Sequence, residues 1–166
     1  MKAAIISGAS VGIGSATAEL FAQEGYIVYC LARRECPVSG VNSIECDLST
    51  QGSIDDACQR LERELVDCEE IALVHNASQM LKDRVDGCAS DDLAHVLAIN
   101  VTGINSLNQY LIPMMQASSS VLYIGSTLSE KAVANSFSYV TSKHAQLGMM
   151  RATCQDLMGS GIHTAM

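Results

Sequence analysis

The alternation of short apolar runs with longer segments of helical periodicity constrains this chain more than any other feature. The helical segments lie at residues 13–25, 51–68, 91–116 and 136–158, and the apolar runs at 2–7, 26–32, 41–47, 71–77, 120–126 and 161–166. Runs that are apolar throughout are typical of strands in parallel sheets that are covered on both faces. We therefore predict an α/β fold in three layers, with a doubly wound parallel sheet between two layers of helices.

The chain of 166 residues carries no internal repeat, low-complexity segment or linker, so we expect a single domain over residues 1–166. A domain of this length buries roughly 70% of the surface that its unfolded chain exposes, which allows a real core. The last apolar run is still in progress at Met166. We therefore expect the sequence to be cut off in the sixth strand, with the C-terminal part of the fold outside it.

The charge of the chain limits its partners. A formal net charge of −8 opposes binding to a phosphate backbone, so we expect no nucleic-acid partner, although one phosphate-bearing cofactor needs only a few local donors. No apolar run reaches the about 20 residues that cross a bilayer, and the N-terminal residues are typical of a first strand rather than a signal peptide. We expect a chain with no membrane contact.

The seven cysteines and four histidines show no metal-ligand spacing. The cysteine count is odd and no C-x-x-C pair is present, so we expect free thiols in a reducing cytoplasm rather than disulfides or zinc ligands. The histidines are scattered along the chain, and we expect no metal site. His144 follows Lys143 directly and points about 100° away from it on a helix, so we expect it to be structural.

The glycine-rich stretch "SGASVGIG" (7–14) follows the first predicted strand and opens the first predicted helix. Gly8, Gly12 and Gly14 would let the backbone turn tightly and approach a pyrophosphate, whose charge is stabilised at the helix N-terminus. Glycine spacing alone is a weak signal that ordinary strand–helix turns also show. Its place at the first strand-to-helix junction of an alternating chain favours a dinucleotide site.

The end of the second predicted strand bears on the choice of dinucleotide. In such folds the residue roughly 20 positions past the glycines contacts the adenosine ribose. Ala32 stands there in place of an acidic residue, and Arg33 and Arg34 follow it. Guanidinium groups beside a neutral residue suit a 2′-phosphate, so we expect NADP(H) to be preferred, with NAD(H) as the alternative. Two solvated surface arginines would give the same sequence.

Tyr139 and Lys143 lie four residues apart in "FSYVTSKHAQ" (137–146), so a helix sets them on one face. A tyrosine normally holds its proton to a pKa of about 10. A neighbouring ammonium favours the phenolate and lowers that pKa, which makes the phenol a usable general acid and base. The alternative is a packed tyrosine beside a solvated lysine.

The motifs of this chain, taken in the order in which they occur, resemble those of the short-chain dehydrogenase/reductase family over nearly the whole chain. The resemblance implies a Rossmann fold. "SGASVGIG" is similar to the family's T-G-x-x-x-G-I-G turn, with Ser7 in place of Thr. "HNAS" (75–78) matches the N-N-A-G stretch in part, since His75 and Ser78 depart from it. The remaining matches are "CDLS" (46–49), "NVTG" (100–103) and "GS" (125–126), which stands thirteen residues before "YVTSK" (139–143).

The resemblance implies a role for each matching residue. The catalytic set would be Ser126, Tyr139, Lys143 and Asn100, with Asn100 anchoring a water that leads from Lys143 to solvent. Lys143 would also hold the ribose hydroxyls of the cofactor. The cofactor would be bound by Gly8, Ser10, Val11, Gly12, Ile13, Gly14, Arg33, Asp47, Leu48, Asn76, Ala77, Ser78, Tyr139 and Lys143.

These residues predict an NADP(H)-dependent oxidoreductase that interconverts a carbonyl and an alcohol, with a ketone, an aldehyde or a β-ketoacyl thioester as the small-molecule substrate. One alternative is a non-catalytic nucleotide-binding module of the same fold. Another is an epimerase or dehydratase with the same Tyr–Lys pair, although those proteins show a different glycine spacing. Helices 91–116 and 136–158 carry apolar residues on more than one face, and we expect them to join a homodimer or homotetramer unless both faces are internal.

Overall fold

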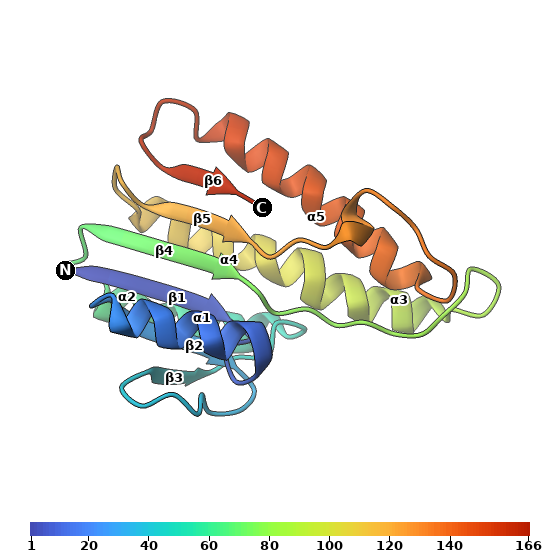
Figure 1. Cartoon of the computed structure of the whole chain (residues 1–166), viewed down its shortest axis with the longest axis horizontal. Coiled ribbons are helices and arrows are strands. Elements are labelled where there is room, and N and C mark those ends of the chain that lie inside the picture. Colours follow the sequence, from blue (N-terminus) through green and yellow to red (C-terminus); the bar gives the residue numbers. More distant parts are fainter.

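The computed structural model describes residues 1–166 and contains one sheet of six parallel strands (Figure 1). The strand order is β3-β2-β1-β4-β5-β6. The strands β2 and β3 lie on one side of β1 and the strands β4 to β6 on the other, so the order of addition switches between β1 and β4. The predicted parallel α/β fold is therefore confirmed. The strands are β1 (Lys2–Ser7), β2 (Ile27–Ala32), β3 (Asn42–Glu45), β4 (Glu70–His75), β5 (Ser120–Tyr123) and β6 (His163–Ala165).

Helices cover both faces of the sheet. They are α1 (Gly12–Gln23), α2 (Gln51–Glu64), α3 (Ser90–Leu97), α4 (Gly103–Leu111) and α5 (Phe137–Asp156). On one face, α1 packs on β1, β2 and β4 around Ala18, Val28 and Val74. On the other face, α2 and α4 bury a larger cluster that includes Leu61 and Leu107. The carboxyl ends of all strands point to the same edge, where the connecting loops gather (Figure 1).

The segment predicted as one long helix over 91–116 is interrupted. After α3, a π-helical segment η1 (Ala98–Thr102) precedes α4, and a 3₁₀ turn η2 (Ile112–Met114) ends the run. Pro113 lies in that turn, where the missing N–H of proline cannot continue the α-helical hydrogen bonds. Single π-turns inside helices insert one residue and redirect side chains, frequently at functional sites. Asn100 lies in η1 and is buried there.

Three predicted strands end earlier than expected, and the first of them is β3, which ends at Glu45 instead of residue 47. β4 ends at His75, so Asn76 to Ser78 lie in the loop that follows it. β5 ends at Tyr123, and Ser126 begins a 3₁₀ turn, η3 (Thr127–Ser129), instead of ending the strand. Ala77 and Ile124, which lie just past the ends of β4 and β5, still pack against the core clusters, so the apolar run extends beyond the strand.

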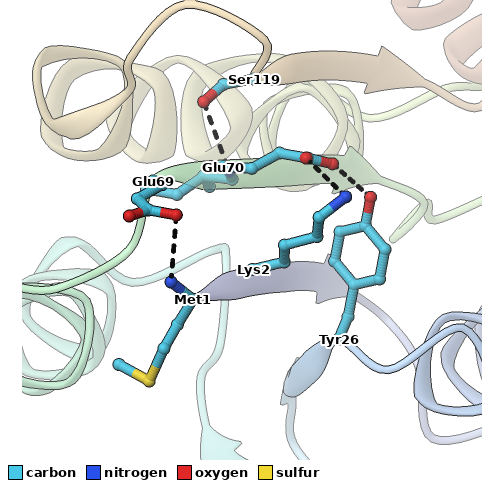
Figure 2. Close-up of polar contacts among 7 residues, drawn as sticks. Met1, Lys2, Tyr26, Glu69, Glu70 and Ser119 are labelled. Carbon is cyan, nitrogen blue, oxygen red and sulfur yellow. Dashed lines mark hydrogen bonds and ion pairs between the residues drawn. The ribbon is translucent and has the colours of Figure 1, made fainter.

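A polar cluster joins the amino ends of the strands, at the edge opposite those loops (Figure 2). The Lys2 ammonium lies 2.9 Å from a Glu70 carboxylate oxygen, and the Tyr26 hydroxyl donates to the other oxygen of that carboxylate. The Ser119 hydroxyl accepts from the backbone N–H of Ile71 at 3.1 Å. These contacts join β1, β4 and the residues before β2 and β5, so they hold the strand starts in register.

Candidate active site

The turn between β1 and α1 packs against the loop after β4 at distances that only glycine allows. A Cβ on Gly8 would lie 2.8 Å from the Ala77 Cα, and Gly8 has a φ of +71°. A Cβ on Gly14 would lie 2.4 Å from both the Asn76 Nδ2 and the Gly8 carbonyl oxygen. The Asn76 side chain in turn donates to the carbonyls of Ser7 and Gly8, at 3.0 Å each. The glycines therefore bring the first turn and the β4 loop into direct contact.

A cavity of about 310 Å³ opens at the carboxyl ends of β1, β2 and β4. Nine predicted cofactor residues line it: Gly8, Ser10, Val11, Arg33, Asp47, Leu48, Asn76, Ala77 and Ser78. Five others do not: Gly12, Ile13, Gly14, Tyr139 and Lys143. The wall also holds Ala32 and Arg34, which the sequence placed beside Arg33 at the end of the second strand. Four further lining residues had no signal in the sequence: Leu31, Cys46, Gln79 and Ile99.

The β2 end of this cavity is positively charged. Ala32, Arg33 and Arg34 line it together, so no carboxylate stands at the end of β2. Asp47, on the neighbouring wall, accepts hydrogen bonds from the Ser49 hydroxyl at 2.7 Å and the Ser49 N–H at 2.9 Å. These bonds, with a smaller effect of Arg33, hold the pKa of Asp47 below its usual range. Asp47 is therefore an ionised acceptor, oriented by its own turn.

Helix α5 differs from an ordinary sheet-covering helix in what it buries. Its four fully buried residues, Ser138, Ser142, Lys143 and Gln146, are all polar or charged. Burying polar groups costs free energy unless each is hydrogen-bonded, and charged groups cost most. A helix selected only for packing would place apolar residues there. The polar face of α5 therefore points to a chemical role.

Lys143 is 2% exposed and has no carboxylate partner. Its ammonium donates to the Ile124 carbonyl at 2.9 Å and to the Gln146 Oε1 at 2.8 Å. The same ammonium lies 5.7 Å from the centre of the Tyr139 ring, so the predicted pair does share one face of the helix. Burial lowers the pKa of Lys143 to about 8, because the charged form loses its hydration.

Ser126 lies where the chain leaves β5. Its hydroxyl oxygen accepts from the Leu128 N–H at 3.1 Å, and its own N–H donates to the Ser129 hydroxyl at 3.3 Å, which together cap η3. The turn η3 packs against α5. The cap uses the Ser126 oxygen only as an acceptor, so the hydroxyl proton is available to a further acceptor.

Asn100 connects the cavity wall to α5. Its side chain accepts from the Gln79 N–H at 2.7 Å and donates to the Gln79 carbonyl at 2.8 Å. It also donates to the Ser142 hydroxyl at 2.9 Å, and that hydroxyl donates to the Tyr139 carbonyl at 2.8 Å. The amide of Asn100 thus contacts Gln79 and Ser142 rather than Lys143 itself.

Three residues near this site escaped the sequence analysis. Gln79 takes part through its backbone, which leaves no signal in the sequence. Ser142 and Gln146 lie one residue before and three residues after Lys143. Gln146 lies on the same helix face as Lys143, so the i to i+3 relation could have identified it, whereas Ser142 lies about 100° away and gives no such signal.

The two histidines near the motifs lie outside the cavity. His75 is fully buried, and its Nε2 lies 2.7 Å from the Asn108 Oδ1. Burial lowers the pKa of His75 to about 4. His144 is exposed, with its Nδ1 2.9 Å from the Val140 carbonyl.

All seven cysteines are free thiols. No three His, Cys, Asp or Glu side chains come together in a way that could hold a metal ion. None of the helices combines the length and the apolarity that crossing a bilayer requires.

Comparison with known proteins gives the family. The family model described as short chain dehydrogenase matches residues 2–166. A 3-oxoacyl-[acyl-carrier-protein] reductase, MabA of Mycobacterium avium, is 25% identical over 163 residues, which cover 97% of this chain and 63% of that protein. The mitochondrial borneol dehydrogenase of Lavandula x intermedia is 24% identical over 169 residues, covering 97% of this chain and 65% of that protein.

A crystal structure of a short chain dehydrogenase family protein from Francisella tularensis superposes with a TM-score of 0.90 at 25% identity, covering 99% of this chain and 67% of that one. The chain thus spans about two thirds of the length of the proteins it matches. The match of the family model over residues 2–166 agrees with the glycine turn, the cavity and the polar helix face. The chain belongs to the short-chain dehydrogenase/reductase family.

Proposed function

We propose that this chain is an NADP(H)-dependent oxidoreductase that interconverts a carbonyl and an alcohol, with Tyr139 as the general acid and base. The observation that carries the proposal is the buried ammonium of Lys143, which has no counter-ion and lies 5.7 Å from the Tyr139 ring centre. An uncompensated positive charge in a poorly hydrated site acts strongly on a neighbouring phenol. A purely structural lysine would be expected to carry a carboxylate partner or to reach solvent.

The residues of the cavity fit a dinucleotide phosphate. The glycine turn leads into α1, whose first turn carries no acidic residue and whose N–H groups and helix dipole favour a pyrophosphate. Arg33 and Arg34 beside the neutral Ala32 favour a 2′-phosphate over a free 2′-hydroxyl, which supports NADP(H). When bound, the nicotinamide supplies the hydride in reduction and accepts it in oxidation. We propose NADP(H) as the preferred cofactor, with NAD(H) as the weaker one.

The protein groups would move and orient the proton. Tyr139 would donate its phenolic proton to the carbonyl oxygen in reduction and accept it back in oxidation. Lys143 would favour the phenolate through its charge. The hydroxyl proton of Ser126, which its cap leaves unused, would hydrogen-bond the developing alkoxide. Asn100 would hold Gln79 on the cavity wall in place relative to α5.

The names of the relatives support the reaction class more than a substrate. One is named as a reductase of 3-oxoacyl thioesters and another as a dehydrogenase of borneol, a secondary alcohol. Both names describe a carbonyl–alcohol pair. We propose the same class for this chain, with a ketone, an aldehyde or a β-ketoacyl thioester as the substrate.

The test measures carbonyl-dependent consumption of NADPH with one substrate from each of these three groups. We expect Tyr139→Phe to lower kcat/KM by about 10²–10⁴-fold, the usual contribution of a general acid. The matched control is Tyr110→Phe, which removes a phenol that hydrogen-bonds Asp55 on the outer side of α2 and α4. Equal rates for wild type and Tyr139→Phe would overturn the role of Tyr139. Binding of NADPH without turnover of any carbonyl would favour a non-catalytic nucleotide-binding module.

We further propose a homodimer or homotetramer that pairs α3–α4 and α5 with the same helices of a second copy. Support comes from α5, whose half-buried Val140 and Leu147 lie outside its fully buried face and outside both core clusters. Sedimentation equilibrium would show a mass of two or four chains. A monomer at all accessible concentrations would contradict this proposal.

A further inference from the structure

Gln146 is a glutamine in a position where packing alone would favour an apolar residue. It is fully buried on α5, and its Oε1 accepts from the Lys143 ammonium at 2.8 Å. Its Nε2 is also buried and has no hydrogen-bond partner. A buried amide N–H without a partner is destabilising, whereas methionine or leucine would fill the same space without that cost. The glutamine is therefore retained for what its carbonyl oxygen does.

The Lys143 ammonium has three N–H donors, and neutral oxygens take two of them. One is the Ile124 carbonyl beside the end of β5, and the other is the Gln146 Oε1 one turn along the same helix. The third N–H is left for a group in the site. One acceptor follows β5 and the other lies on α5, so together they fix the position of the Lys143 nitrogen in addition to accepting two of its hydrogen bonds.

No charged group competes with these contacts. Of the elements packed against this part of α5, η1 and η3 carry no titratable residue. The titratable residues of the other elements do not contribute to the pKa of Lys143, which burial alone lowers; they are Asp91, Asp92 and His95 of α3, Tyr123 of β5 and His163 of β6. On α5 itself, Tyr139 is the titratable side chain under the ammonium.

We propose that Gln146 is a positioning residue, whose neutral oxygen fixes the Lys143 ammonium beside Tyr139 without cancelling its charge. A carboxylate in its place would hold the nitrogen equally well but would neutralise its field at the phenol. An apolar side chain would preserve the field but would leave the nitrogen with a single anchor. The inference rests on the proposed roles of Tyr139 and Lys143.

The test uses Gln146→Glu and Gln146→Met, which keep the side-chain length and change only the acceptor. The chain has four lysines, at positions 2, 82, 131 and 143, so selective ¹³Cε labelling gives few resonances, and Lys143→Arg assigns the relevant one. The wild-type Lys143 should titrate near its pKa of about 8. Gln146→Met should lower that pKa by about one unit, because the charged form loses an acceptor, and Gln146→Glu should raise it by at least as much.

Kinetics provides the second readout. The pH at which kcat/KM falls on the alkaline side should move down in Gln146→Met and up in Gln146→Glu, together with the lysine pKa. The control is Gln155→Met, the same exchange at an exposed position of α5. It should change neither the Lys143 pKa nor the pH dependence of kcat/KM. Thermal unfolding of each variant shows whether it is folded at the pH of each measurement.

An unchanged Lys143 pKa in both folded variants would overturn the proposal. So would a pKa that shifts while the pH dependence of kcat/KM stays in place, because the ammonium would then not act on the reaction. The lysine titration needs no turnover. If wild type reduced no carbonyl, shifts in both variants would still support the anchoring of Lys143 by Gln146, and the failure would belong to the proposed reaction alone.

Discussion

Lys143 is the single buried lysine among the four in this chain, and its surroundings explain why a lysine can be tolerated there. Two neutral oxygens replace part of the hydration that burial removes, yet the pKa still falls to about 8. The residue is therefore close to losing its charge under mildly alkaline conditions. If the charge of Lys143 supports the reaction, activity should decline as the pH rises through that value.

Arg33 allows a prediction about cofactor choice at the same scale. Replacement by serine would remove the charge-assisted hydrogen bond that we propose between Arg33 and a 2′-phosphate, and bonds of this kind contribute about 1.5–3 kcal/mol. We expect Arg33→Ser to weaken NADPH binding by about 10- to 100-fold and to leave NADH binding nearly unchanged, because NADH lacks that phosphate. Fluorescence titration with both nucleotides measures the difference.

The control for that experiment is Arg63→Ser, an exposed arginine in the last turn of α2, away from the cavity. It should alter neither affinity. An equal loss of affinity for both nucleotides in Arg33→Ser would instead place the guanidinium on a part that the two cofactors share.

At the scale of elements, the loop after β4 caps the helix that carries Tyr139. The Asp83 Oδ1 accepts from the Ser138 N–H at 3.1 Å, and the Asp83 carbonyl accepts from the Phe137 N–H at 3.3 Å. Hydrogen bonding from Ser138 holds the pKa of Asp83 below its usual range. The start of α5 is therefore positioned by a loop more than fifty residues earlier in the chain.

Removing this cap should destabilise the protein. We expect Asp83→Ala to lower the free energy of unfolding by about 1 kcal/mol, as helix caps of this kind usually contribute, with a smaller loss in Asp83→Asn. Because the folded pKa of Asp83 is depressed, its contribution is present at neutral pH and is lost as the pH falls through that folded pKa. Urea unfolding at pH 7 and pH 3 measures both effects.

Asp86 offers a matched control on the same loop. It pairs with Arg84 at 2.9 Å, but both side chains are more than 60% exposed. Exposed ion pairs contribute little, so Asp86→Ala should leave the free energy of unfolding nearly unchanged. A larger effect at Asp86 than at Asp83 would contradict the capping role.

At the scale of the whole molecule, one chain of hydrogen bonds crosses four elements. The His75 Nε2–H donates to Asn108, whose amide donates to the Tyr123 hydroxyl at 2.9 Å. Tyr123 lies 3.0 Å from the Thr153 hydroxyl, which donates to the Met149 carbonyl. The chain joins β4, α4, β5 and α5. The Asn108 Oδ1 is an acceptor, so the His75 Nε2 carries the proton, and the buried Nδ1 has no partner to which a second proton could be donated.

This network predicts a loss of stability in acid. The folded pKa of His75 is about 4, and an unfolded histidine titrates near 6.5, so unfolding takes up a proton between these values. Stability contributed by neutral His75 is complete above pH 6.5 and falls as the pH is lowered toward 4, by on the order of 3 kcal/mol. Urea unfolding across this range measures the slope.

His75→Asn should flatten that slope, because no group at the position then titrates. His144→Asn, which changes an exposed histidine, should keep the wild-type slope. If His75→Asn and wild type lost stability in parallel between pH 6.5 and 4, the acid sensitivity would have to come from groups other than this network.

The sequence predicted elements well where a local pattern decides them, and less well at their ends. The six strands and the long helices follow from hydrophobic runs and helical periodicity, which act within a few residues. The π-helical segment at Asn100 was missed, because it interrupts a helix without changing the apolar spacing around it. Ser126 was placed at the end of β5 and instead caps η3, since its hydroxyl satisfies the N–H of Leu128.

The sequence by itself determined the parallel α/β architecture, the glycine turn after β1 and the shared helix face of Tyr139 and Lys143. All three depend on periodicity or on backbone freedom, which are properties of neighbouring residues. Only the tertiary structure decided that Lys143 is buried against Ile124 and Gln146, and that Asp83 caps α5. Burial and long-range hydrogen bonds depend on residues that are distant in the chain, and together they set the charge on which the proposed chemistry depends.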